Sequence, residues 1–454
     1  MAAAAGRGVR RGILIALLVV VACDDKPSLD DSDAGEGGDD GSGSGGIGGS
    51  GGSGEDGGSD GGGDGGSDGG DGGSDGGDGG DGGDGGSEGG DGGDCADFEA
   101  SPSLWTLPTG FPEASLETLS DADGEDPVWS LIDLEGDGAP DLVVTRWDDL
   151  GIAALGATEW LVYPNSGAGF GAAETWSLPT GFPAESLYAI TDGDGEDPVW
   201  ALLDLDGGGA PDLVVSRWDD LGIAELGRTT WLVYNNTGSG FGSATTWTLP
   251  TGFPAESLYA ITDADGEEPV WSLVDLDGDA RVDLVVSRWD DLGIADLGST
   301  SWLVYANTGS GFASASTWSL PSGFPLASLY SVTDGDGDDP TWTLVDLRGV
   351  GAPDLVVSKW DDLGIAALDA TQWLIYPNTG SGFGPATTWE LPTGFPDTSL
   401  EALADVDGED PLWGLLDLDG GGAVDLVVSR WDELGISTLG ATEWLVYDSR
   451  CGGR

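Results

Sequence analysis

The chain has 454 residues, with 14 Lys and Arg against 83 Asp and Glu, and a formal net charge of −69 at pH 7. This charge excludes nucleic acid as a partner, because its phosphates would be repelled, and it favours cations, whose binding would relieve self-repulsion. The chain contains no histidine, which excludes a His-based catalytic triad and a histidine-ligated zinc site.

Residues 1–23 predict an export signal. Three arginines precede an apolar run at 13–21, which is shorter than the about 20 apolar residues that span a bilayer. The run ends in Val20-Val21-Ala22-Cys23, which resembles the lipobox of bacterial lipoproteins. This resemblance implies that Cys23 carries lipid and becomes the mature N-terminus. The alternative is an ordinary secretory signal with a chance cysteine.

Both interpretations export the protein. The lipobox implies a place in the bacterial cell envelope, with the outer membrane or the cell surface favoured over the inner membrane. The lipid on Cys23 would be the sole membrane anchor, because no other stretch is apolar enough for a transmembrane helix.

Residues 24–94 consist mostly of Gly, Asp and Ser, with almost no apolar side chains. Such a segment cannot bury enough surface to offset its chain entropy, so it predicts a disordered tether. A calcium-binding β-roll is the alternative, but its repeat needs a large apolar residue once per turn of the roll, and none is present.

A tandem array follows and predicts an all-β, five-bladed β-propeller over 95–451. The phrase Trp-x-Leu-Pro-x-Gly-Phe-Pro recurs every 71 residues, at Trp105, Trp176, Trp247, Trp318 and Trp389. The first full repeat has four strand signals, at 128–134, 141–147, 159–163 and 174–178. Four antiparallel strands per repeat are typical of one propeller blade. The 20 tryptophans, four per repeat, are expected mostly in blade-to-blade packing.

The ends of the array favour a closed ring. A lone strand at 104–107 opens the array, and the strand at 444–447 ends it, so the first strand is expected to complete the last blade. Cys95 and Cys451 flank the two ends, and with Cys23 assigned to lipid they predict a disulfide in an exported protein. Two unpaired thiols are the alternative.

An acidic hairpin loop recurs in each repeat. In the first copy two apolar runs flank a loop in which Gly136 and Gly138 permit positive φ. Its acids follow the pattern D-x-D-x-D-G-x-x-D, and calcium prefers six to eight such oxygens. A strand follows the loop, with no helix and no Glu at position 12, which argues against an EF-hand. The alternative is a set of plain Asp/Gly turns.

The acidic loop, together with Asn-Thr-Gly-x-Gly-Phe-Gly at 378–384 and its counterparts, resembles FG-GAP/VCBS repeats, the blades of integrin α-chain propellers and of many bacterial surface proteins. The resemblance covers 105–447. That family usually forms seven blades, whereas five longer repeats are present here. The resemblance implies calcium ions held by the acidic loops.

Repeat by repeat, the calcium ligands that the resemblance implies are Asp133, Glu135, Asp137 and Asp141; Asp204, Asp206 and Asp212; Asp275, Asp277, Asp279 and Asp283; and Asp417, Asp419 and Asp425. Gly208 and Gly421 replace an acid in repeats two and five. In repeat four, Arg348 and Val350 stand between Asp346 and Asp354. We expect no ion there, because the guanidinium can serve as an internal cation.

The face opposite the acidic loops is the predicted ligand-binding face. It carries two kinds of loop, those between the fourth and first strands, such as 121–127, and those between the second and third strands. A second calcium site in the loops of the first kind is an alternative. The latter supply a cation, an aromatic ring and a carboxylate, which suit sugar or peptide recognition. The residues are Arg146, Trp147, Asp148, Arg217, Trp218, Asp219, Arg288, Trp289, Asp290, Lys359, Trp360, Asp361, Arg430, Trp431 and Asp432. Alternatively, the cation and carboxylate pair with each other while the tryptophan packs beneath them.

The sequence therefore predicts a monomeric, lipid-anchored, calcium-stabilised module for binding or adhesion to an extracellular glycan or protein. Catalysis is not expected, because the repeats are so alike that none stands out with unusual residues. The rival hypotheses are a propeller-type enzyme acting on glycosides and a purely structural envelope protein.

Overall fold

The computed structural model describes residues 97–451, apart from 113–114, 120–126, 184, 191–197, 255, 262–268, 326–327, 333–339, 366, 369, 397–398, 402 and 404–410. The predicted lipobox, the tether and Cys95 lie outside these residues, so lipidation, the tether and the disulfide stay predictions. Cys451 is described and is half-buried against the apolar cluster between the last two blades. No helix in the described ranges is long and apolar enough to cross a membrane.

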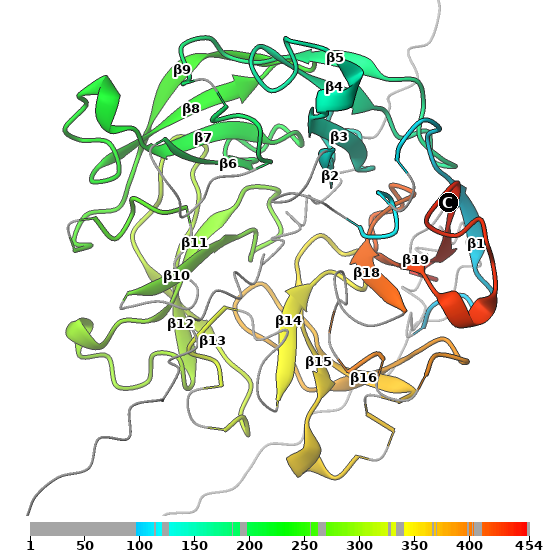
Figure 1. The fold of residues 1–454 in the computed structure, drawn as a ribbon. Coiled ribbons are helices and arrows are strands. Elements are labelled where there is room, and N and C mark those ends of the chain that lie inside the picture. The colour runs from blue at the N-terminus through cyan, green and yellow to red at the C-terminus, as the bar shows by residue number, and fades with distance from the viewer. Residues whose placement is uncertain are drawn as a thin grey trace, which may run out of the picture. The chain divides into compact units, whose positions relative to one another are not determined.

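Five antiparallel sheets of four strands each lie side by side around a common centre (Figure 1). Blade one consists of β2 (Val128–Ile132), β3 (Asp141–Arg146), β4 (Glu159–Tyr163) and β5 (Glu174–Ser177). Blade two consists of β6 (Val199–Leu203), β7 (Asp212–Arg217), β8 (Thr230–Asn236) and β9 (Phe241–Thr248). Blade three consists of β10 (Val270–Val274), β11 (Asp283–Arg288), β12 (Ser301–Tyr305) and β13 (Ser316–Ser319). Blade four consists of β14 (Thr341–Val345), β15 (Asp354–Lys359), β16 (Gln372–Tyr376) and β17 (Thr387–Glu390).

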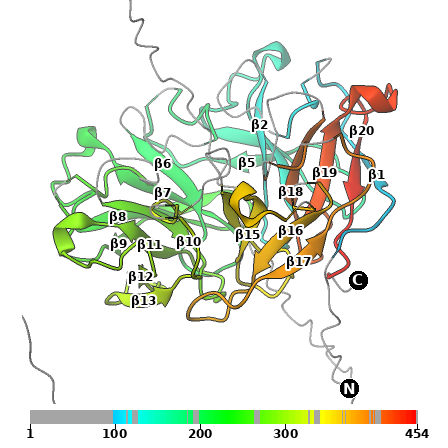
Figure 2. The same ribbon diagram turned by 90° about the horizontal axis from the view of Figure 1, so that it is seen from below.

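Blade five confirms the predicted closure. It consists of β18 (Leu412–Leu416), β19 (Asp425–Arg430), β20 (Glu443–Tyr447) and β1 (Ser103–Thr106), so the first strand of the chain completes the last sheet. Strand β1 runs antiparallel to β20, with Trp105 opposite Trp444 (Figure 2). In each blade the four strands are named a, b, c and d in this order. The five-bladed, all-β propeller predicted from the repeats is therefore confirmed.

The strand bounds differ slightly from the predicted ones. Strand a of blade one ends at Ile132 rather than at residue 134, because the Asp133 carboxylate turns the chain by accepting backbone N–H bonds. Strand b ends at Arg146, because Trp147 leads into a short 3-10 helix, Asp148–Leu150. The same helix recurs at Asp219–Leu221, Asp290–Leu292, Asp361–Leu363 and Asp432–Leu434.

A stacked pair of tryptophans packs at every blade interface. The strand c tryptophan of one blade lies on the strand a tryptophan of the next, with ring centroids 6.0–6.3 Å apart and interplanar angles of 26–29°. All ten rings are fully buried. The pairs are Trp160–Trp200, Trp231–Trp271, Trp302–Trp342, Trp373–Trp413 and Trp444–Trp129. The last pair joins blade five to blade one and closes the ring.

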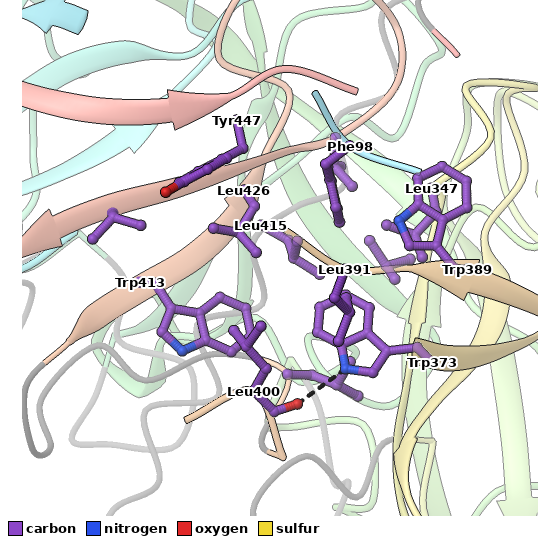
Figure 3. Packing of buried hydrophobic residues seen from close by; sticks show 14 of the residues in the cluster. Phe98, Leu347, Trp373, Trp389, Leu391, Leu400, Trp413, Leu415, Leu426 and Tyr447 are labelled. Carbon is purple, nitrogen blue, oxygen red and sulfur yellow. Dashed lines mark hydrogen bonds between the residues drawn. The ribbon is translucent and has the colours of Figure 1, made fainter. Parts of the chain in front are cut away.

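Both indoles of each pair also hold the loop between strand d and the next strand a, the d–a loop. At the closing interface the indole N–H of Trp444 donates to the carbonyl of Leu116 (2.8 Å), and that of Trp129 to the carbonyl of Ser115 (3.0 Å). Equivalent bonds of 2.9–3.0 Å recur at the other four interfaces. Figure 3 shows one of them, from Trp373 to Leu400. The buried indoles of the stacked pairs thus leave no unpaired donor.

Phe98 completes the interface between blades four and five. Elsewhere, a phenylalanine from the loop between strands c and d, or from the start of strand d in blade two, packs edge-on against two tryptophans of the preceding blade, as Phe170 does on Trp105 and Trp444. Blade five has no such loop, because its strands c and d come from opposite ends of the chain. Phe98 takes this place, with ring centroids 5.4 Å from Trp389 and 6.4 Å from Trp373 (Figure 3).

We predict that Phe98→Ala weakens closure of the ring. The ring is 3% exposed, so the substitution removes a buried aromatic side chain and should lower the free energy of unfolding by about 3 kcal/mol. Urea denaturation followed by tryptophan fluorescence measures the loss. Leu104→Ala in β1, where the side chain is 58% exposed, is the matched control and should be near neutral. Equal stability of the two variants would show that Phe98 does not close the ring.

Candidate functional site

The five loops between strands a and b are the acidic loops, at 133–141, 204–212, 275–283, 346–354 and 417–425, and are numbered one to five with their blades. In loop one the carboxylate of Asp133 accepts hydrogen bonds from the backbone N–H groups of Gly136 (2.7 Å), Asp137 (3.1 Å) and Gly138 (2.8 Å). Gly136 and Gly138 have φ of 73° and 96°, as the sequence predicts. A Cβ on Gly136 would also lie 3.0 Å from Ala210, so neighbouring acidic loops are in close contact.

The second feature that the five loops share is a buried aspartate at the start of strand b. Asp141 Oδ1 accepts a hydrogen bond from the backbone N–H of Asn165 (2.9 Å), in the loop between strands c and d. The Asn165 amide group in turn donates to the carbonyl of Leu418 in acidic loop five (2.8 Å). The Asp bond recurs in all five blades, and the amide bond to the preceding blade recurs in blades two to four. The predicted sharing of one face by these two loop types is therefore observed.

Burial makes these carboxylates costly to ionise. Desolvation raises the pKa of Asp133 to about 6 and of Asp141 to about 7, and the nearby acids add to the shift. The same cause raises the pKa of Asp204 and Asp346 to about 6 and of Asp212, Asp275, Asp283 and Asp417 to about 7. Burial raises the pKa of Asp425 well above its usual range, and the charges of Asp419, Asp417 and Asp448 add to this.

Three acidic loops bring carboxylates together. One oxygen of each acid lies within 4.8 Å of the others in three groups, which are Asp204, Asp206 and Asp212; Asp275, Asp277 and Asp279; and Asp417, Asp419 and Asp425. Among the described residues, loops one and four do not form such a group, although loop one has four acids.

The donor set fits a hard cation. Asp212 Oδ2, Asp283 Oδ2 and Asp417 Oδ1 are buried, and none accepts a hydrogen bond of ordinary length and angle from the described part of the chain. Backbone N–H groups still interact with two of these carboxylates, from Leu205 with Asp212 and from Gly420 and Gly421 with Asp417. An unpartnered buried carboxylate oxygen is unfavourable unless a cation or a proton satisfies it. Oxygen-only ligands of this kind suit calcium or magnesium rather than zinc.

Loop four contains its own cation. Arg348 donates from Nε to Asp354 Oδ2 (2.7 Å) and from Nη2 to Asp354 Oδ1 (2.6 Å), and Asp354 has a fully buried side chain. Asp354 occupies the position of Asp141 and Asp212 in their loops. The expected placement of the Arg348 guanidinium inside loop four is thus observed, and it marks a place where the fold accommodates positive charge.

On the opposite face, the loops between strands b and c, the b–c loops, hold the predicted ligand-binding residues. Trp147 is 6% exposed and packs on Phe111 with ring centroids 4.5 Å apart. Arg146 Nη2 lies 3.1 Å from Asp148 Oδ2. The remaining four tryptophans are buried in the same way, and Arg217, Arg288 and Arg430 pair with the carboxylates of Asp219, Asp290 and Asp432. This geometry matches the alternative in which the tryptophan supports the loop and the cation pairs beside it, and ligand binding by these residues stays a prediction.

The d–a loops supply partners that the sequence reasoning missed. The guanidinium of Arg146 lies 5.8 Å from the ring centroid of Tyr188, and two further arginines lie over Tyr259 and Tyr330 in the same way. In the other two blades the cation meets an acid instead: Lys359 Nζ is 2.7 Å from Glu401, and Arg430 Nε is 3.8 Å from Glu117. The spacing of 42 residues from each arginine to its tyrosine could have revealed these pairs.

The tips of the b–c loops expose apolar side chains. One leucine in each loop is exposed by 41–44%, namely Leu150, Leu221, Leu292, Leu363 and Leu434. Ile152, Ile223, Ile294 and Ile365 are exposed as well, two residues further along. A glycine in the left-handed conformation, such as Gly151 with φ 65°, lies between each leucine and isoleucine.

Comparison with known proteins does not assign the chain to a family. No protein-family model matches the chain, and no curated protein matches it significantly, so the FG-GAP/VCBS likeness stays a resemblance. Among solved structures, the Tc holotoxin pore of Photorhabdus luminescens is 15% identical over 78% of this chain, with a TM-score of 0.35, and the match spans 15% of the toxin chain. An Agrocybe aegerita lectin that recognises non-reducing terminal N-acetylglucosamine is 16% identical over 72% of this chain and 67% of its own, with a TM-score of 0.34. Likenesses at this level carry no argument about ligand or activity.

We predict that the ion-free protein becomes less stable as the pH rises from 5 to 8. The buried acids have folded-state pKa values of about 6 to 7, above the about 3.9 of an unfolded aspartate. Their contribution to stability is therefore fully present below the unfolded pKa and is lost as the pH passes the folded values. Melting in excess chelator should fall by several degrees, and calcium at pH 8 should restore it. A melting temperature that is flat or rises over this range contradicts the burial argument.

We also predict that Arg348→Ala destabilises blade four. The change leaves Asp354 buried without its counter-charge, and because the Arg348 side chain is 28% exposed we expect a loss of about 2 kcal/mol rather than the full cost of breaking a buried pair. Calcium should recover part of this loss. The control is Arg217→Ala, which breaks an exposed pair with Asp219 and should be near neutral. Chemical denaturation with and without calcium measures both, and an unchanged Arg348→Ala protein would contradict the internal-cation role.

Proposed function

We propose that the protein is a calcium-stabilised, non-enzymatic module that binds an extracellular ligand on its b–c loop face. The observation that carries this proposal is the fivefold repetition of one exposed loop on a rigid frame. Each copy presents a leucine of nearly equal exposure beside a cation and two acids. Exposed loops held by a rigid scaffold are typical binding sites, and equivalent copies suit a multivalent ligand.

We further propose that cations bound in the acidic loops stabilise the propeller. The orphaned oxygens of Asp212, Asp283 and Asp417 support ion binding in loops two, three and five. The acid content of loop one supports a fourth ion, held by Asp133, Glu135, Asp137 and Asp141. When bound, the calcium would neutralise carboxylates that are otherwise desolvated and crowded. The acidic loops lie on the face opposite the b–c loops, so the ion would stabilise the frame rather than contact the ligand.

The geometry favours a protein ligand over a sugar. Stacking on a sugar needs an open aromatic face, and the b–c loop tryptophans are 5–6% exposed. The exposed leucine and isoleucine tips instead resemble the apolar anchors of protein interfaces. The glycan alternative stays open through the partly exposed tyrosines such as Tyr188.

Export, anchoring, oligomeric state and repeat type are inferred from the sequence. We propose that the chain is exported and anchored through lipid on Cys23, as a monomer in the bacterial cell envelope, and that its repeats are of the FG-GAP/VCBS type. The near-identical blades favour binding over catalysis, because an enzyme site needs an asymmetric set of residues. Turnover of chromogenic glycosides would instead favour the enzyme hypothesis.

The test is a selection on a phage-displayed peptide library and a glycan array in calcium, followed by binding of the hits to two variants. Replacing the leucines at 150, 221, 292, 363 and 434 with serine should abolish binding of the selected ligands. Val350→Ser is the control, because Val350 is 57% exposed on the opposite face. Ligands that bind the five-leucine variant as tightly as the wild type, or a library and array without hits, would contradict the proposed binding face.

A further inference from the structure

The five repeats differ at two positions of the acidic-loop region in a correlated way. The fifth loop position holds Asp137, Gly208, Asp279, Val350 and Gly421 in blades one to five. Each strand c contains one tyrosine near its end, and the residue directly after this tyrosine is Pro164, Asn235, Ala306, Pro377 and Asp448 in blades one to five. Blades with glycine in the loop have Asn or Asp directly after this tyrosine, and blades with aspartate in the loop have an apolar residue there. Blade four, which contains Arg348, has an oxygen ligand at neither position.

The two positions converge on the same site. Leu213 pairs with Tyr234 across strands β7 and β8, so Asn235 lies opposite Asp212. Leu426 pairs with Tyr447 in the same way, so Asp448 lies opposite Asp425. Side chains opposite each other in an antiparallel pair project from the same face of the sheet. Asn235 and Asp448 are thus placed beside the buried aspartates of loops two and five.

In blade two a direct contact supports this placement. The Nδ2 atom of Asn235 donates to Asp206 Oδ2 at 3.0 Å, and Asp206 belongs to the converging group with Asp204 and Asp212. The amide carries a donor on one side and an acceptor on the other, so a half-turn about its Cβ–Cγ bond would present the oxygen to the group. A cation held by the three acids would favour that orientation.

Two features favour positive charge at these sites. The side chain of Asp212 is 1% exposed, and its Oδ2 accepts no hydrogen bond of ordinary geometry in the described part of the chain, although the backbone N–H of Leu205 interacts with this carboxylate. The Oδ1 atom of the half-buried Asp417 in loop five is likewise buried without such a bond, although the N–H groups of Gly420 and Gly421 interact with its carboxylate. In loop four, both oxygens of the equivalent Asp354 are satisfied by a guanidinium. A cation at this position is therefore compatible with the fold.

We propose that Asn235 and Asp448 are ligands of the cations in acidic loops two and five, where they replace the missing fifth-position carboxylate. This inference rests on the cation binding in the proposed function. Loop two would combine Asp204, Asp206 and Asp212 with the amide oxygen of Asn235. Loop five would combine Asp417, Asp419 and Asp425 with the carboxylate of Asp448. Backbone carbonyls and water supply the further oxygens that calcium needs.

The test counts calcium ions bound per full-length chain by atomic emission after dialysis at a fixed free calcium concentration. Asn235→Ala and Asp448→Ala should each bind one ion fewer than the wild type, or hold that ion with roughly tenfold lower affinity. Asp279→Ala is the positive control and should also remove one ion. Ala306→Ser and Pro164→Ala, at the same position in loops three and one, should leave the count unchanged.

A rescue separates a lost ligand from a damaged fold. Gly208 lies outside the left-handed region of φ, so the backbone there admits an aspartate, as Asp279 shows in loop three. Its Cβ would lie 2.8 Å from Asp206 Oδ1, so the Asp206 carboxylate has to turn aside in Gly208→Asp. In the Asn235→Ala background, Gly208→Asp should restore the ion. A wild type that binds calcium, with Asn235→Ala and Asp448→Ala binding as many ions, overturns this inference alone. Loss of the ion in Asn235→Ala that Gly208→Asp does not restore overturns the inference for loop two. A wild-type protein that binds no calcium overturns the proposed cation role as well.

Discussion

The stacked tryptophan pair between neighbouring blades is the contact on which the rest of the structure depends. A single four-stranded sheet cannot bury both of its faces, so each blade needs a neighbour on either side. Both indoles of a pair are fully buried, and their two N–H groups hold the d–a loop at consecutive carbonyls such as those of Ser115 and Leu116. One pair thus positions the blade and one of its loops together. The five pairs have nearly the same geometry, so the loop carbonyls that they hold recur with nearly the same hydrogen-bond lengths.

The ring has to be closed by the chain ends. Strand β1 restores the hydrogen-bonded edge of blade five, and Phe98 restores the aromatic packing that the missing loop would have provided. Further contacts join the ends beyond the strands: the backbone N–H of Glu99 donates to the carbonyl of Asp448 (2.8 Å), and Arg450 pairs with Asp97. The closure therefore extends to residues 97–99, which precede β1, and Asp448, the partner of Glu99, lies beside acidic loop five.

The repeats made most of the fold predictable. A constant period with four strand signals predicted five blades, and the unpaired strands at the two ends predicted the closure. Residues 159–163 were even predicted with the observed bounds, because a tryptophan and a tyrosine frame that strand. Phe98 was missed because it precedes its tryptophan by seven residues, whereas the phenylalanines of the repeats precede theirs by six.

The candidate sites were less predictable, since they depend on which way side chains point. Trp147 has the same sequence context whether it faces a ligand or the core, and only its packing on Phe111 distinguishes the two. The role of Asp448 depends on strand register, which places a residue far along the chain opposite Asp425. Arg348 was the exception, because a cation among acids in one repeat of five already indicated its partner.

The central claim is that a closed tryptophan-packed ring presents acidic loops that need positive charge, supplied by calcium in four blades and by Arg348 in the fifth. A crystal structure of the protein grown in calcium, with ions located by anomalous scattering, tests this most directly. The account predicts an ion in acidic loops one, two, three and five, and the guanidinium alone in loop four. Loops that hold only water, or an ion beside Arg348, would contradict it.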